Sequence, residues 1–171
     1  GGPVRDSIFT YATGNDVDWY LECGFQAVKL ACPYGPADGL DGIDKNEEFV
    51  AEARELCGDH VEIMLDCYMA LDLQYAAELA RVLMPFNLKG IEEPFMPDDY
   101  AAHAKLADRF EGLGTTTYFA TGEHEYTRYG YQQLIEAGVG LLQPDVMWMG
   151  GPTEFSRVVA QASAQGVDVV P

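Results

Sequence analysis

The amino-acid sequence predicts an α/β fold in which parallel strands and crossover helices form most of a TIM-like barrel. Short β-type runs alternate with longer runs of helical periodicity along the whole chain, which is typical of a parallel sheet with crossover helices. The motifs GxGxxG and GxxxxGKS/T, which often mark an open doubly wound sheet, do not occur in the sequence. The 171 residues are enough for one domain with a sizeable core.

Seven segments of β-branched, aromatic and other apolar residues are predicted to be strands. In chain order they are residues 8–12, 27–32, 61–66, 88–92, 117–121, 140–143 and 167–170. A closed barrel of this type has eight strands, so the seven predicted strands leave one position open. We therefore expect an incomplete barrel, which further sequence or another chain would have to close.

Six segments between these strands have helical periodicity. They are residues 16–22, 45–57, 72–84, 98–110, 127–137 and 153–165. Asp72 suits the N-cap of the third helix, which has an apolar stripe and is predicted to end at Pro85. Thr153 is the expected N-cap of the last helix, and Gly166 is expected to end it. Residues 33–44, rich in Gly and Pro, are predicted to form a long functional loop at the rim of the barrel.

The charge of the chain limits its partners. Ten Lys and Arg residues stand against 28 Asp and Glu residues, which gives a net charge of −18. This argues against nucleic acid and anionic membranes as partners. No apolar run is long enough to span a bilayer, and no signal peptide is visible. The four cysteines form no CxxC pair, so we predict a reducing, cytoplasmic location.

Acidic residues recur where the predicted strands end, at Asp66, Glu92, Glu123 and Asp145. They lie about one βα unit apart, and the carboxyl ends of barrel strands all open on one face, so these side chains should converge. Converging carboxylates repel each other unless a cation neutralises them or their pKa values rise. An acidic residue after a strand can instead cap the next helix. The Glu-Glu-Pro run after the fourth strand does not suit a cap, and all-oxygen ligation suits Mg²⁺.

Six stretches of sequence carry a resemblance to a known family. They are GGPVRDSI, AVKLACPYGPADG, IMLDCYMALD, KGIEEPFMPDDY, TGEHEYTRYG and GVGLLQPDVMWMGGPTEF. In them the chain resembles the enolase superfamily, namely its mandelate-racemase-like branch of acid-sugar dehydratases, and within that branch those acting on L-rhamnonate. The resemblance implies a modified (β/α)7β barrel. It also implies Mg²⁺ ligands at Asp66, Glu92 and Glu123, the positions already reached from the strand ends.

The resemblance further implies a reaction. A base removes the proton α to a sugar-acid carboxylate, Mg²⁺ stabilises the resulting enediolate, and loss of a β-hydroxyl yields a 2-keto-3-deoxy acid. In this branch the base is a histidine at the end of the seventh strand, expected just after Pro171, and Asp145 matches the aspartate that orients it. Ala31 stands where racemases of the branch carry a second lysine, which favours dehydration over two-base racemisation.

Two further residues are expected to bind the substrate. Lys29 matches the first lysine of that pair and can steer the substrate carboxylate, although a lysine that simply neutralises acidic neighbours is an equal alternative. His124 follows Glu123 at the mouth of the site, where a substrate hydrogen bond and a purely local role are both open.

Residues 1–171 are therefore expected to be one partial catalytic barrel domain, without the N-terminal capping domain and the C-terminal end of the barrel. The expected partner is a small sugar acid, and the family predicts a homo-oligomer. Alternative functions are the dehydration of another acid sugar such as L-lyxonate, or a truncated, non-catalytic metal-binding fragment without the base. We expect this chain by itself to bind divalent metal weakly and to turn over no substrate.

Overall fold

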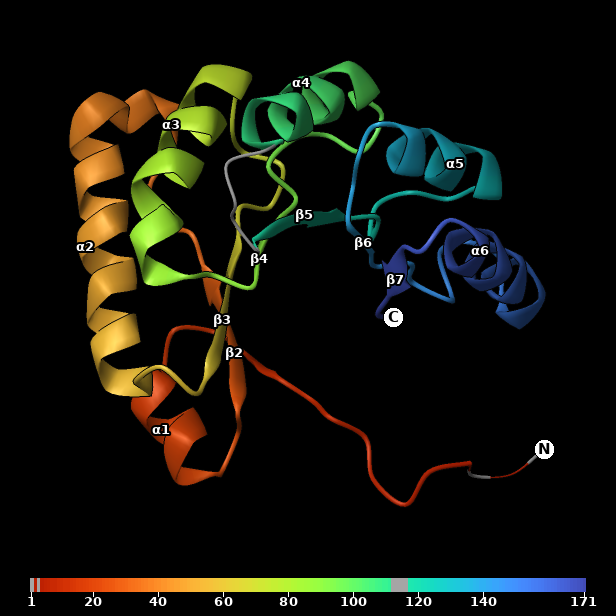
Figure 1. Cartoon of the computed structure of the whole chain (residues 1–171), viewed down its shortest axis with the longest axis horizontal. Coiled ribbons are helices and arrows are strands. Elements are labelled where there is room, and N and C mark those ends of the chain that lie inside the picture. The colour runs from red at the N-terminus through yellow and green to blue at the C-terminus, as the bar shows by residue number, and fades with distance from the viewer. Residues whose placement is uncertain (1, 3, 112–116) are drawn as a thin grey trace.

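The computed structural model describes residues 2, 4–111 and 117–171. Its strands form one seven-stranded sheet in the order β1 to β7, in which every pair of neighbours is parallel. The sheet curves into an open half-barrel, and the helices lie on its outer side (Figure 1). The predicted fold, an incomplete TIM-like barrel, is confirmed.

The strands are short, and their register aligns the predicted site. Their bounds are β1 Ala12–Thr13, β2 Ala27–Ala31, β3 Glu62–Asp66, β4 Gly90–Glu92, β5 Tyr118–Thr121, β6 Leu141–Leu142 and β7 Asp168–Val169. Asp66 pairs with Ala31 on one side and with Glu92 on the other. Because the register is continuous, the carboxyl ends of β3 and β4 lie side by side.

The six predicted helices are confirmed. They are α1 Val17–Glu22, α2 Gly39–Cys57, α3 Leu73–Leu83, α4 Tyr100–Phe110, α5 Arg128–Glu136 and α6 Pro152–Ala164, with 3₁₀ turns η1 Pro36–Asp38 and η2 Met84–Phe86. The predicted cap of α3 is present, because the Asp72 carboxylate accepts a hydrogen bond of 2.8 Å from the Tyr75 backbone N–H. Pro85 lies inside η2, so the α-helical part ends slightly earlier than predicted.

Three local predictions are wrong. The first strand is not residues 8–12 but Ala12–Thr13, and Ile8 and Phe9 are exposed on a segment that leaves the sheet (Figure 1). The physical reason is that, within the part of the chain that the structure describes, β1 pairs only with β2, so this apolar segment has no second strand to hold it. Thr153 does not cap α6, because Gly151 occupies the N-cap and Pro152 the first helical position.

The third error concerns residues 33–44, which are not a long loop. Helix α2 already begins at Gly39, directly after η1. Gly42 resembles a loop glycine in the sequence, but it allows close packing inside the helix. A Cβ there would lie 2.8 Å from the Tyr75 hydroxyl and 2.6 Å from the Asp38 Cβ.

The main core lies between the outer face of the sheet and the helices. Side chains without solvent exposure include Val28 and Leu30 on β2 and Ile63 and Leu65 on β3. All four cysteines of the chain are free thiols. Within the described residues, no helix combines the length and the apolar character that crossing a membrane requires.

Candidate metal and substrate site

Lys29 holds the centre of the predicted site. Its side chain is buried, with Nζ 2.6 Å from Glu92 Oε1 and 3.3 Å from Asp66 Oδ2. Three adjacent strands thus contribute to one cluster, with Lys29 on β2, Asp66 at the end of β3 and Glu92 at the end of β4. One ammonium ion neutralises two carboxylates that would otherwise repel each other.

The protonation states of this cluster depend on burial and on mutual attraction. Burial alone would lower the pKa of Lys29, but the hydrogen bond that Lys29 donates to Glu92 and the charges of Glu92 and Asp66 raise this pKa above its ordinary value. Burial raises the pKa of Glu92, against hydrogen bonds from Gln143 and Lys29 that lower it. A contact of 2.6 Å between Lys29 Nζ and Glu92 Oε1 is strongest when both groups are charged, so the geometry favours the ionised pair.

A small cavity of about 190 Å³ connects this cluster with other predicted site residues. Lys29, Glu92, Glu123 and Asp145 all contribute to its wall. Sequence reasoning missed Tyr11 and Gln143, which also line the cavity. The sequence contained a signal for Gln143, because this polar residue directly follows the apolar strand β6, and Glu92 stands in a similar position at the end of β4.

Hydrogen bonds of Tyr131 and Glu125 stabilise the loop that carries Glu123 and His124. The Tyr131 hydroxyl lies 2.7 Å from the Gly122 carbonyl oxygen and 2.9 Å from the Glu125 carbonyl oxygen, and it donates to one of them at a time. The buried Glu125 carboxylate accepts hydrogen bonds from the backbone N–H groups of Tyr126 and Thr127 and from the Tyr100 hydroxyl. The loop is therefore fixed at both ends of the TGEHE motif. Glu123 itself is exposed.

His124 contacts a residue that sequence reasoning did not assign to the site. Its Nδ1 atom lies 2.7 Å from Oε1 of Glu93, which is only 1% exposed. Burial raises the pKa of Glu93, and the hydrogen bond with His124 opposes that rise. The signal available in the sequence was the second glutamate of the Glu-Glu-Pro run. His124 and Glu93 are thus paired with each other, and each directly follows a residue that lines the site cavity, Glu123 and Glu92 respectively.

Backbone strain is concentrated around Glu93. Among the described residues, four that are not glycine have positive φ, and three of these, Tyr68, Met69 and Glu93, meet here. The Met69 N–H donates to the Glu93 carbonyl oxygen at 2.6 Å. Each such residue costs on the order of 1–3 kcal/mol, and proteins keep such strain mostly at functional sites.

Asp145 is held by the turn that follows β6. Its Oδ1 atom accepts hydrogen bonds from the N–H groups of Met147 at 2.7 Å and Trp148 at 2.9 Å. The carboxylate thus has a fixed orientation at the cavity wall, and its second oxygen keeps its acceptor capacity.

The donor set fits Mg²⁺ in chemistry, although the side chains are not arranged as a closed cage. Within the described ranges, no group of three or more His, Cys, Asp or Glu side chains is close enough to hold a metal ion. Asp66 and Glu92 already share one cation, Lys29, and Glu123 lines the same cavity as Glu92. Oxygen-only ligation of this kind is what Mg²⁺ prefers. A metal at Glu92 would take over the neutralising role that Lys29 has here.

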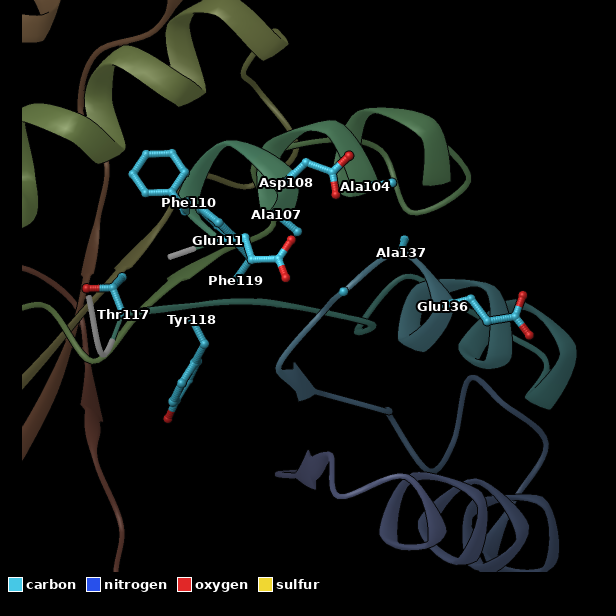
Figure 2. Close-up of a pocket in the computed structure, with 11 residues that line it drawn as sticks. Ala104, Ala107, Asp108, Phe110, Glu111, Thr117, Tyr118, Phe119, Glu136 and Ala137 are labelled. Carbon is cyan, nitrogen blue, oxygen red and sulfur yellow. The ribbon is translucent and has the colours of Figure 1, made fainter. Parts of the chain in front are cut away.

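Two of the larger cavities differ in their relation to this site. One of about 390 Å³ covers the inner, mostly apolar face of the half-barrel, includes Ile8 and Met64, and shares Tyr11, Glu92 and Gln143 with the site cavity. The other, of about 440 Å³, lies between α4 and α5, where Asp108, Glu111 and Glu136 are found (Figure 2). This second cavity is at the start of β5, opposite the carboxyl ends that carry the site.

Comparisons with known proteins identify the family of the chain. Residues 14–171 match the family described as Enolase C-terminal domain-like. The whole chain is 45% identical to a putative L-rhamnonate dehydratase of Caldivirga maquilingensis, of which it covers 42%, and 43% identical to an L-rhamnonate dehydratase of Saccharopolyspora erythraea, of which it covers 43%. The chain therefore spans less than half the length of these relatives.

Solved structures show the same likeness. The whole chain superposes on 43% of the L-rhamnonate dehydratase of Gibberella zeae with a TM-score of 0.92 and 40% identity, and a second structure of that enzyme is a complex with Mg. A 3,6-anhydro-D-galactonate cycloisomerase of Zobellia galactanivorans matches 96% of the chain and 46% of its own length, at 31% identity and a TM-score of 0.84. The chain belongs to the enolase C-terminal domain-like family.

Proposed function

We propose that this chain forms the metal-binding part of a Mg²⁺-dependent sugar-acid dehydratase that converts an acid such as L-rhamnonate to a 2-keto-3-deoxy acid. One observation carries the proposal. Carboxylates from two neighbouring strands share a single buried cation, on the wall of a cavity that Glu123 and Asp145 also line. The names of the relatives support the substrate class.

Asp66, Glu92 and Glu123 would hold the metal. When bound, Mg²⁺ would stabilise the negative charge that develops on the substrate carboxylate during proton abstraction. Lys29 would then be released from Glu92, and its ammonium group would be available to bind that carboxylate. A lysine between two carboxylates and the cavity is well placed for this exchange, because it is already charged and desolvated.

Two other residues would serve the substrate. Asp145, fixed by two backbone N–H groups, would orient a histidine base that the family supplies from the seventh strand. His124 would bind a hydroxyl group of the acid. Cytoplasmic location and assembly into a homo-oligomer remain predictions.

Metal binding by the chain tests the first half of this proposal. We expect Mg²⁺ binding, measured by titration calorimetry, to be lost in Glu92→Gln, which keeps the shape of the side chain and removes its charge. Glu62→Gln is the matched control, because Glu62 begins the neighbouring strand β3 and pairs with Lys89 at the opposite end. Binding that is absent in the wild type, or equal in Glu92→Gln, would overturn the metal site.

Product formation tests the second half. The longest obtainable form of the protein is incubated with Mg²⁺ and L-rhamnonate, with L-lyxonate as the competing acid, and the 2-keto-3-deoxy acid is followed. We expect product from L-rhamnonate that requires Mg²⁺ and disappears in Glu92→Gln. No product from either acid, despite metal binding that depends on Glu92, would overturn the proposed substrates and leave the metal site standing.

A further inference from the structure

The loops that follow β3, β4, β5 and β6 converge on one imidazole ring, that of His124. Tyr68 and Trp148 both lie edge-on to this ring, with centroid distances of 5.6 Å and 5.1 Å. Tyr126 stacks on Trp148 with ring planes 2° apart. These contacts restrict rotation of the imidazole, but they do not determine which of its nitrogens carries the hydrogen.

Glu93 determines which nitrogen of the His124 ring carries the hydrogen. Its Oε1 atom lies 2.7 Å from His124 Nδ1. An ionised carboxylate can only accept, so Nδ1 must donate, and Nε2 of the neutral ring is then an acceptor. Among the described residues, Nε2 has no hydrogen-bond partner, and it is not one of the side-chain atoms closed off from solvent. The ring thus presents an available acceptor.

Glu93 is built firmly into this position. Its side chain is buried, its φ is +43°, and its backbone N–H donates to the Ala120 carbonyl oxygen at 2.9 Å. Its second carboxylate oxygen is buried without a partner in the described part of the chain. A buried carboxylate with a single side-chain partner on a strained backbone does not suit solvation or helix capping, and this indicates a role in orienting the partner.

We infer that Glu93 is a positioning residue that fixes His124 in the Nδ1–H tautomer and leaves Nε2 free to accept a hydrogen bond from a ligand hydroxyl group. Only the identity of the ligand, a polyhydroxylated acid, rests on the proposed function. The tautomer and the orientation of the ring are properties of this chain alone.

Nitrogen NMR of the imidazole groups tests the inference directly, at about pH 8, where an ordinary imidazole is neutral. The chain has only three histidines, and the signals of His124 are identified by their loss in His124→Gln. In the wild type we expect a protonated Nδ1 and an unprotonated Nε2. Signals of His60 and His103 from the same samples report whether each variant remains folded.

Two variants of Glu93 separate the hydrogen bond from the charge. Glu93→Met removes the acceptor, so His124 should shift toward the Nε2–H tautomer. Glu93→Gln removes the charge but keeps a carbonyl oxygen that accepts from Nδ1, so it should retain the wild-type tautomer. An Nε2–H tautomer in the wild type, or an unchanged tautomer in a folded Glu93→Met, would overturn the positioning role.

Addition of the acid sugar with Mg²⁺ tests the ligand without requiring turnover. We expect the Nε2 resonance of His124 to shift on addition of L-rhamnonate and not on addition of Mg²⁺ alone. An unmoved Nε2 resonance, with the tautomer results as expected, would overturn the proposed ligand while the positioning role of Glu93 stands. The positioning role of Glu93 and the identity of the ligand can therefore be refuted independently.

Discussion

Lys29 and Glu92 form a buried ion pair of 2.6 Å between the middle of β2 and the end of β4, across the intervening strand β3. Asp66, on that intervening strand, lies 3.3 Å from the same ammonium nitrogen. The lysine therefore stabilises two carboxylates at once, and both of them are proposed ligands of the metal.

Replacement of Lys29 by Met should destabilise the metal-free chain. Removing one partner of a buried ion pair leaves an uncompensated charge and typically costs about 3–5 kcal/mol. Urea denaturation gives the free energy of unfolding.

Because Mg²⁺ would replace the missing charge, its addition should raise the urea midpoint of Lys29→Met more than that of the wild type. An equal Mg²⁺ effect in both proteins would contradict the competition between Lys29 and the metal. Lys45→Met, at an exposed pair with Asp41, is the control and should change little.

Arg54 should be important for stability although it lies far from the site. Its guanidinium donates hydrogen bonds to the carbonyl oxygens of Gly58, Val61, Phe86 and Asn87, at 2.7–3.2 Å, and so connects the end of α2 with the segments before β3 and β4. Lysine cannot reproduce this planar fork. We expect Arg54→Lys to lower the free energy of unfolding by about 2–3 kcal/mol, since hydrogen bonds to charged groups contribute about 1.5–3 kcal/mol. Arg81→Lys, at an exposed pair with Glu78, is the matched control, and an equal effect of both changes would contradict the explanation.

Gly130, in the first turn of α5, should not tolerate alanine. A Cβ at this position would collide with the Glu125 carboxylate, which organises the TGEHE loop. Glycine to alanine within a helix usually stabilises it by about 1 kcal/mol, so a loss of stability would reveal the collision. In Glu125→Ala the carboxylate is absent, and the added methyl group should then cost less. A double-mutant cycle by denaturation measures this coupling, and simple additivity would refute it.

His103 should make the fold sensitive to mild acid. It is buried on α4 and packs edge-on against Phe95, with ring centroids 5.2 Å apart. Burial lowers its pKa, against smaller contributions from the Met96 backbone and the charge of Asp99 that raise it. The unfolded chain therefore binds a proton more readily than the folded chain. Stability should be complete above the ordinary histidine pKa of about 6.5 and should decrease as the pH falls below it.

His103→Leu should remove this part of the acid sensitivity. Denaturation midpoints at about pH 7.5 and about pH 5.5, on either side of the ordinary histidine pKa, measure the effect. The difference between the two midpoints should be smaller in His103→Leu than in the wild type. His60→Asn is the control, because His60 is exposed just before β3, and it should leave the difference unchanged. An unchanged difference in His103→Leu would show that another group is responsible.

The class of fold, the order of the elements and the carboxylates at the strand ends could be predicted from the amino-acid sequence, because hydrophobic periodicity and strand spacing are local properties. The sequence did not reveal the ion pair of Lys29 with Glu92, which lies 63 positions away, or the contact of His124 with Glu93, which lies 31 positions away. These contacts depend on the curvature and register of the sheet.

Local patterns also failed where packing decided the outcome. Gly42 resembles a loop residue but lies within a helix, and glycine suits this helical position because the Tyr75 hydroxyl leaves no space for a larger side chain. Ile8 and Phe9 resemble strand residues but lie outside the sheet, because a strand exists only where a neighbour supplies hydrogen bonds. Secondary-structure propensity and motif spacing can be recognised in the sequence. The partner of each buried charge and of each strand edge depends on how the elements pack in the tertiary structure.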